Sequence, residues 1–113
     1  MKAHTFGQSG EVIAVKFLRQ QGYRILERNF RTKCGEIDII ARKKNQLVFI
    51  EVKTRSSSNF GLPEEAVTEK KLFHLRRCVE FYLLKKKLKV SYRLEILSIL
   101  WGTPPVCRII PVD

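Results

Sequence analysis

The spacing of apolar residues divides the chain into two helical and five strand segments. Apolar residues recur every three to four positions, the period of a helix, at about residues 5–21 and 68–86. Alternating or continuous apolar runs rich in β-branched residues predict strands at about residues 23–30, 36–42, 47–53, 91–100 and 106–112. The resulting order, αβββαββ, predicts an α/β domain with a mixed sheet flanked by helices.

Turn-forming residues mark the connections between these segments. Residues 32–35 are typical of a tight turn, and residues 43–46 are typical of a β-hairpin. Thr68 is a suitable N-cap for the second helix. Residues 55–63 form the one polar stretch rich in Ser, Gly and Pro, and it reads as a loop inside the fold. A length of 113 residues is enough for one core, so residues 1–113 are expected to form a single domain.

The hairpin at residues 43–46 is expected to bring acidic residues together. Pairing around this turn places Asp38 opposite Glu51 and Glu36 opposite Lys53, and directly opposed residues have Cβ atoms about 5 Å apart on one face. Two carboxylates at that separation repel each other unless a cation lies between them. Mg²⁺ or Mn²⁺ fits, because each is bound by one or two carboxylates together with water and phosphate oxygens.

Strand alternation adds a lysine to the same face, because Lys53 follows Glu51 by two residues. A metal polarises a phosphodiester and activates water, while an adjacent ammonium positions that water or neutralises developing charge. Glu36 is expected to support Lys53 as an ion pair. Asp38, Glu51 and Lys53 are therefore candidate residues for phosphodiester hydrolysis.

Purely structural explanations of these residues remain open. A Glu-x-Lys tripeptide arises readily by chance, and the chain has a second copy at Glu69–Lys71. If the third strand were an edge strand, Glu51 and Lys53 would simply face solvent. Glu11 is in line with the apolar stripe of the first helix, so it either points towards the sheet or complements the helix dipole near its start.

The charge of the chain favours a polyanionic partner. It has 22 Lys plus Arg against 11 Asp plus Glu, for a net charge of +11. Nucleic acid is the first candidate, whereas a solvated basic surface and an anionic membrane surface are the alternatives. The candidate nucleic-acid contacts are Arg55, Lys70, Lys71, Arg76 and Arg77. The four on the second helix could equally form a solvated face.

Cysteine usage and the N-terminus suggest a reducing, cytoplasmic location. Cys34, Cys78 and Cys107 are odd in number and far apart, which argues against a disulfide framework. The first residues lack the apolar stretch of a secretory signal, and no apolar run is long enough to span a bilayer. We therefore expect no membrane partner.

Short motifs spread over nearly the whole chain occur together in one order. They are Gly7-x-x-Gly10-Glu11-x-x-Ala14, Gly22-Tyr23, Arg28-Asn29-Phe30-Arg31, Gly35-Glu36-Ile37-Asp38-Ile39-Ile40-Ala41, Val48-Phe49-Ile50-Glu51-Val52-Lys53-Thr54-Arg55, and Phe60-Gly61-Leu62-Pro63 with Lys70 beyond. In these motifs the chain resembles the YraN-like family of small bacterial proteins. That family belongs to the PD-(D/E)xK, or restriction-endonuclease-like, nuclease superfamily and is similar to archaeal Holliday-junction resolvases.

The resemblance implies a role for each candidate residue. It makes Asp38 and Glu51 metal ligands, Lys53 the catalytic lysine and Glu11 the helix-one acid of the resolvase-like branch. It also makes the backbone carbonyl of Val52 a further ligand.

The chain departs from the superfamily pattern at two places. Ile37 stands where a proline usually precedes the acid, a change that the superfamily tolerates. Arg93-Leu94-Glu95 stands where such families carry Arg-aromatic-Asp, so that strand is expected to be structural.

The sequence thus predicts a Mg²⁺- or Mn²⁺-dependent endonuclease acting on DNA, with branched DNA of the Holliday-junction type as the preferred substrate. A homodimer is one option, because resolvases cut two strands symmetrically. The alternative is a non-catalytic nucleic-acid-binding module that keeps the nuclease fold. A third hypothesis is a protein-interaction domain with a basic surface.

Overall fold

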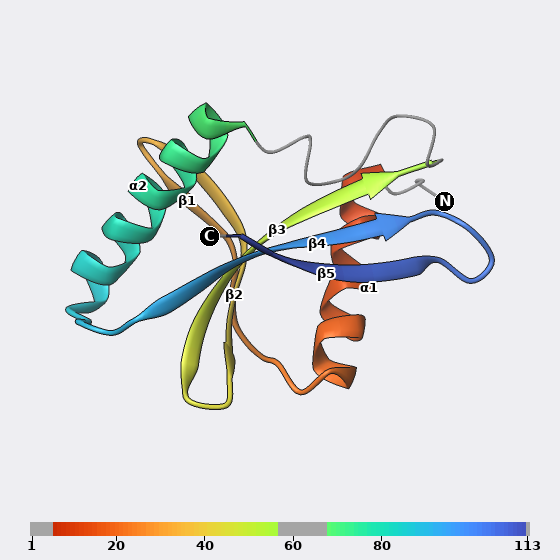
Figure 1. The fold of residues 1–113 in the computed structure, drawn as a ribbon, viewed down its shortest axis with the longest axis horizontal. Coiled ribbons are helices and arrows are strands. Elements are labelled where there is room, and N and C mark those ends of the chain that lie inside the picture. The colour runs from red at the N-terminus through yellow and green to blue at the C-terminus, as the bar shows by residue number, and fades with distance from the viewer. Residues whose placement is uncertain (1–5, 57–67, 113) are drawn as a thin grey trace.

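The computed structural model describes residues 6–56 and 68–112, with the side chains of residues 6–9 left out of the description (Figure 1). Five strands form one mixed sheet in the order β1-β2-β3-β4-β5. The elements are α1 (Phe6–Gln20), β1 (Arg24–Thr32), β2 (Gly35–Lys43), β3 (Gln46–Arg55), α2 (Glu69–Lys86), β4 (Tyr92–Leu100) and β5 (Val106–Val112). This confirms the predicted α/β class and the order αβββαββ.

Only one pair of neighbouring strands is parallel within the described sheet. β3 and β4 run parallel, with α2 between them in the chain, and the other three neighbouring pairs are antiparallel. A parallel pair needs such a crossover because its second strand must start again from the same end of the sheet.

Each helix covers its own hydrophobic cluster on the sheet. Ala14 and Leu18 of α1 pack with Ile39 of β2, whereas Val79 of α2 packs with Ile40. Successive residues of a strand point to opposite faces, so the two helices lie on opposite sides of the sheet. No helix in the described ranges is long and apolar enough to cross a membrane.

Local signals at the ends of α2 and in the hairpin behave as predicted. The Thr68 side chain accepts a hydrogen bond from the Lys71 N–H at 3.2 Å, which satisfies one of the free donors at the helix start. The β2–β3 hairpin turns at Lys44, which has a left-handed φ of 51°, and Lys43 pairs with Gln46 across it. The predicted register of this hairpin is therefore confirmed as far as Ile39 opposite Ile50.

Side chains stop alternating regularly between the two faces of the sheet at Asn29 of β1 and Asp38 of β2. These two residues lie between two directly paired positions of the strands. Asn29 has a left-handed φ of 53°, and the flanking residues pair as Arg28 with Ile39 and Phe30 with Ile37. Ile37 packs in the α2 cluster and Ile39 in the α1 cluster, although residues two apart on a regular strand share a face. The β1–β2 hairpin is visibly curved (Figure 1). Asp38 consequently lies at the point on β2 where the buried side chains change from the α2 face of the sheet to the α1 face.

The buried carboxylate of Glu95 links β4 to Tyr23, the residue just before β1. Glu95 is 1% exposed, accepts a hydrogen bond from the Tyr23 hydroxyl at 2.7 Å and forms an ion pair with Arg93. Burial, together with the Glu95 carboxylate, raises the pKa of Tyr23. Buried charges are stable only with such partners, so these contacts are consistent with the structural role expected for this strand.

Gly10 sets the distance between α1 and the sheet. A Cβ atom at this position would lie 2.3 Å from Cγ2 of Thr54 on β3, well inside van der Waals contact. The next residue is Glu11, so any displacement of the helix here also moves that carboxylate.

We predict that Gly10→Ala lowers the free energy of unfolding by about 1–3 kcal/mol, the usual cost of overpacking. Thr54→Ser removes the obstructing methyl group and should restore most of the loss in the double variant. Urea denaturation of the two single variants and the double variant measures this coupling. Equal losses with and without Thr54→Ser would contradict the close contact.

Candidate functional site

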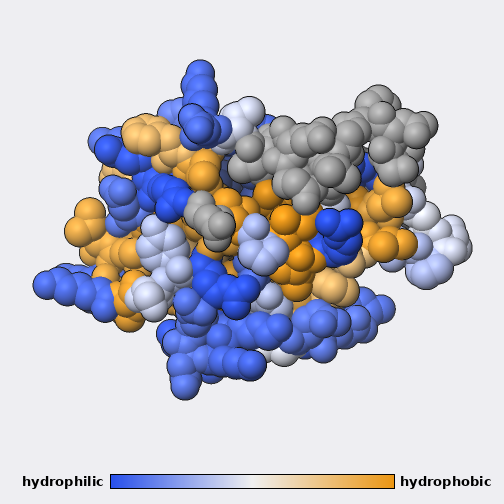
Figure 2. Space-filling view, viewed as in Figure 1, coloured by the Kyte–Doolittle hydropathy of each residue, from blue (hydrophilic) through white to orange (hydrophobic). Residues whose placement is uncertain are grey.

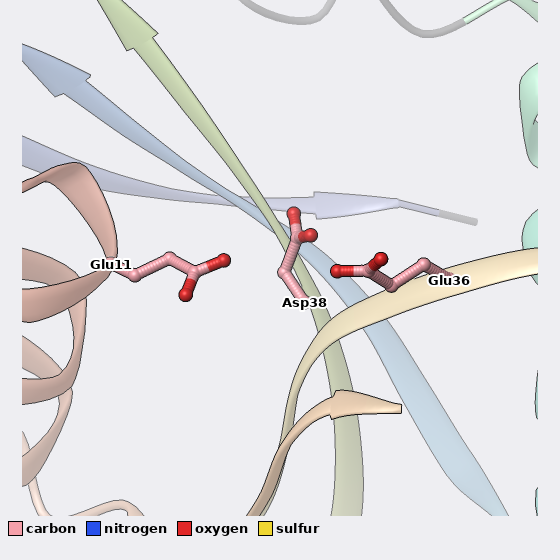
Figure 3. Close-up of side chains that lie close together, drawn as sticks. All are labelled: Glu11, Glu36 and Asp38. Atoms are coloured by element: carbon pink, nitrogen blue, oxygen red, sulfur yellow. The ribbon is translucent and has the colours of Figure 1, made fainter. Parts of the chain in front are cut away.

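Three carboxylates from α1 and β2 converge beside the bend of the sheet. Glu11, Glu36 and Asp38 each contribute one oxygen, and these oxygens all lie within 4.8 Å of one another. Figure 3 shows the Glu11 and Glu36 carboxylates approaching Asp38 from opposite sides. We call these three residues the acidic cluster. Oxygen ligands at this spacing suit a hard divalent cation such as Mg²⁺ or Mn²⁺.

Glu11 points towards the sheet. It lies beyond the first turn of α1, which contains no acidic residue, so the helix-cap alternative is wrong. Its Oε2 accepts a hydrogen bond from Nδ2 of Asn29 at 3.2 Å and lies 3.8 Å from the Arg28 guanidinium. The bend that turns Asn29 thus also orients Glu11.

At Asp38, a hydrogen bond from the backbone of β3 to the side chain takes the place of the next backbone pair between β2 and β3. The β2–β3 ladder ends at Ile39 opposite Ile50, and beyond it the Asp38 carboxylate accepts the Val52 N–H at 2.8 Å. This contact fixes one oxygen of Asp38 against β3. The direct opposition of Asp38 and Glu51 expected from the hairpin is therefore replaced by a side-chain-to-backbone contact.

The electrostatics around Asp38 are unfavourable for a bare carboxylate. Its pKa is raised to about 6, mainly by burial; the Val52 N–H lowers the pKa, and the charges of Glu51, Glu11 and Glu36 add to the rise. Four carboxylates therefore gather in a chain of net charge +11 without neutralising one another. A divalent cation between them would offset this repulsion.

Glu51 and Lys53 form an ion pair next to the acidic cluster. Nζ of Lys53 lies 3.7 Å from Oε1 of Glu51, and both side chains are about three-quarters buried. β3 has β2 and β4 as neighbours, so it is not an edge strand and the edge-strand explanation of this pair is wrong. Glu51 acts on Asp38 by charge but is not part of the three-residue acidic cluster.

Glu36 differs from its expected contact. Its Oε2 lies 3.3 Å from Nε of Arg31, rather than supporting Lys53 as the sequence suggested. The reason is register, since Arg31 and Glu36 are directly opposed in the β1–β2 ladder while the β2–β3 ladder has already ended. Sequence reasoning missed Glu36 as a candidate ligand. The available signal was its spacing of two residues from Asp38.

A hollow of about 250 Å³ opens beside the acids, between the sheet and α2. Glu36 and Glu51 line its sheet side, and Lys71 and His74 line its helix side. We call it the acidic hollow. Of the predicted nucleic-acid contacts, Lys71 is therefore the one that faces the acids.

The other predicted nucleic-acid contacts do not form one stripe. Lys70 and Arg77 are exposed on α2, whereas Arg76 is half-buried and lines a separate hollow with Arg93. Arg55 is half-buried, and its carbonyl accepts the Trp101 N–H at 2.8 Å. The polar loop at residues 57–63, which includes Phe60, lies outside the described residues.

The comparisons with known proteins agree with the motifs. A profile described as "Uncharacterised protein family UPF0102" matches residues 10–99, which include the acidic cluster, Glu51 and Lys53. The chain belongs to this family. A relative from Caldicellulosiruptor saccharolyticus, "UPF0102 protein", is 48% identical over 88% of this chain and 85% of its own length. Others from Persephonella marina (47% identical; 82% and 81% covered) and Clostridium botulinum (46% identical; 86% and 80% covered) carry the same description.

Family membership confirms the YraN-like resemblance drawn from the motifs. The relatives' names state no activity, so the chemistry of the UPF0102 fold has to be argued from the site itself.

We predict that Asp38→Asn stabilises the metal-free protein above about pH 6, by about 2 kcal/mol. The pKa of Asp38 is about 6 in the folded protein, above the ordinary aspartate value of 3.8. The folded state therefore holds the proton more tightly, and the stability from this group is greatest below the unfolded pKa and declines as the pH rises through 6. Asparagine keeps an oxygen that accepts the Val52 N–H and carries no charge.

Urea denaturation in chelator across this pH range measures the effect. Glu80→Gln, which removes an exposed carboxylate on α2, is the matched control and should leave the pH dependence unchanged. A constant difference between Asp38→Asn and wild type from acidic to alkaline pH would contradict the raised pKa of Asp38 in the folded protein.

Proposed function

We propose that this UPF0102 protein is a Mg²⁺- or Mn²⁺-dependent endonuclease that hydrolyses phosphodiesters in DNA, with branched DNA as its preferred substrate. The observation that carries the proposal is the convergence of Glu11, Glu36 and Asp38, with Glu51 beside them and Lys53 paired to Glu51. Packing gives no reason for a fold to gather these charges, because their repulsion costs stability.

The donor set supports a hard divalent cation. In the proposal, Asp38 and Glu51 hold it with Glu11 and the Val52 carbonyl, and Glu36 is a further ligand suggested by the geometry. A cation held there would polarise the phosphodiester and lower the pKa of a bound water. Among the described residues, carboxylates alone make up this cluster, which favours Mg²⁺ or Mn²⁺ over zinc.

The residues of the chain supply position and charge. The Val52 N–H fixes one oxygen of Asp38 and leaves the other free to bind, while Asn29 orients Glu11. Lys53 is held near the acids by Glu51, where its ammonium can orient the attacking water or neutralise charge on the phosphate. In this proposal Lys71, which lines the opposite wall of the acidic hollow, would contact a neighbouring phosphate.

The net charge of +11 supports DNA as the partner, because each phosphate contact by Lys or Arg releases counterions. The free thiols of Cys34, Cys78 and Cys107 are consistent with the reducing cytoplasm as the place of action. A homodimer that cuts two strands symmetrically completes the proposal. The alternative, a binding module without catalysis, predicts DNA binding that ignores both chelator and Asp38→Asn.

We predict that wild type cleaves labelled DNA with Mn²⁺ or Mg²⁺ and that Lys53→Ala and Asp38→Asn each reduce the rate by at least about 100-fold. Duplex, single-stranded and four-way-junction substrates are compared in gel assays, with all proteins purified identically. Lys89→Ala, which removes an exposed lysine between α2 and β4, serves as the matched control for loss of a lysine. Binding without cleavage, unchanged by Asp38→Asn, would contradict the nuclease and favour the binding module; cleavage that survives both variants would place the activity elsewhere.

We also predict that Glu36→Gln weakens Mn²⁺ binding by at least about tenfold, because its oxygen lies within the acidic cluster. Calorimetric titration of Glu36→Gln and Glu51→Gln separates the two candidate ligands. If Glu51→Gln weakens binding and Glu36→Gln does not, Glu36 serves only as the partner of Arg31.

A further inference from the structure

Another hollow, of about 480 Å³, lies between the β1–β2 turn and α2. Phe30 and Phe81 line it together with three cationic side chains, those of Arg31, Lys33 and Lys85. We call it the aromatic hollow. Its volume falls in the range of sites that bind small molecules.

The aromatic hollow is next to the acidic hollow on the same wall. Phe81 and Lys85 of α2 line the aromatic hollow, and His74 and Cys78 line the acidic hollow. Residues 74, 78, 81 and 85 follow the three-to-four-residue spacing of a single helix face. The β1–β2 turn separates the two hollows, because Thr32 and Lys33 face one while Cys34 and Gly35 face the other.

Arg31 connects the aromatic hollow to the acidic cluster directly. It lines the hollow, and its Nε lies 3.3 Å from the Glu36 carboxylate. The Arg31 side chain is 82% exposed, so most of its guanidinium surface remains available to a ligand. A ligand in the aromatic hollow is thus one side chain away from the acids.

The aromatic wall is rigid on one side and exposed on the other. Phe30 packs edge-on against Tyr82, with ring centroids 5.2 Å apart, and Tyr82 packs in turn on Phe49. Phe81 is 38% exposed, and Nζ of Lys85 lies 5.6 Å from the Phe30 ring centroid. Figure 2 shows apolar side chains among hydrophilic ones along the edge of the molecule where α2 lies.

Rings bordered by cations match the chemistry of an unpaired nucleotide. Proteins bind single strands by stacking bases on aromatic side chains while Lys and Arg contact the phosphates. A paired base inside a duplex cannot offer its face to such a ring. An acidic protein segment would use the cations but would leave the rings without a flat partner.

We propose that the aromatic hollow binds an unpaired nucleobase of the DNA substrate, stacked on Phe81, with its phosphates on Arg31, Lys33 and Lys85. The proposal rests on the proposed function for the identity of the polymer, and it names which part of the substrate is recognised. Binding here would select DNA with unpaired nucleotides, such as strand ends, flaps and junctions, and place the adjoining phosphate beside the acidic hollow.

The test measures binding in chelator, so that it does not depend on cleavage. A short labelled single strand and a blunt duplex of the same sequence are titrated with wild type, Phe81→Ala and Leu84→Ala. Leu84 is a matched control because it is 77% exposed on the same helix and does not line the hollow. A fluorescent adenine analogue in the single strand reports stacking on the ring.

We expect Phe81→Ala to weaken single-strand binding by about 10- to 100-fold, the usual effect of losing one stacked base, and to leave duplex binding unchanged. It should also abolish quenching of the analogue, whereas Leu84→Ala should behave as wild type. Equal loss for both DNA forms, or no loss, would overturn the proposal. If Phe81→Ala instead lowers the mass of the assembly in solution and leaves DNA binding unchanged, the proposal would be overturned as well and the hollow assigned to a contact between protein chains.

Failure of this proposal is distinguishable from failure of the proposed function. If the protein never cleaves but Phe81→Ala loses single-strand binding, the aromatic hollow is supported as a nucleobase site and the nuclease proposal is contradicted. If wild type cleaves and Phe81→Ala binds single strands normally, the nuclease stands and the base site falls.

Discussion

Repulsion among the carboxylates around Asp38 is the interaction on which the rest of the site depends. The fold creates it in two ways. α1 approaches β3 closely because Gly10 has no side chain, and this brings Glu11 over the sheet. The bend at Asn29 then moves Asp38 to the boundary between the two faces of β2, where Glu11 and Glu36 reach it from opposite sides. Both features also serve packing, since α1 covers one hydrophobic cluster and the bend places Ile37 and Ile39 in different clusters, but packing alone does not require acids at these positions.

α2 extends this site along one direction. Its inward face covers the second hydrophobic cluster through Val79 and Tyr82, so the helix is fixed against the sheet. The neighbouring face, from His74 to Lys85, forms the wall of both hollows. A polymer following this face would meet cations and aromatic rings at one end and carboxylates at the other.

The sequence predicted those parts of the fold that local rules determine. The capped second helix and the β2–β3 register followed from Thr68, the turn at Lys44 and the alternation of apolar residues. The same rules failed at Asp38, because the left-handed Asn29 belongs to another strand and no local pattern reports its effect. The pairing of Glu36 with Arg31 was missed although it follows from the predicted tight turn at residues 32–35, which places the two residues directly opposite each other.

The positive net charge of the chain and the carboxylates around Asp38 would act on DNA at different distances. If the proposed function holds, the net charge of +11 would attract DNA at long range, whereas the carboxylates around Asp38 would repel a phosphate at close range. A phosphate would then approach the acids only when a cation screens them, whereas the proposed basic and aromatic surface along α2 would attract a strand with or without metal. DNA would thus be held beside the site first and admitted to it only in the presence of the metal. In such an arrangement, recognition of the substrate and its cleavage would depend on different residues. Binding could therefore be measured in the absence of cleavage.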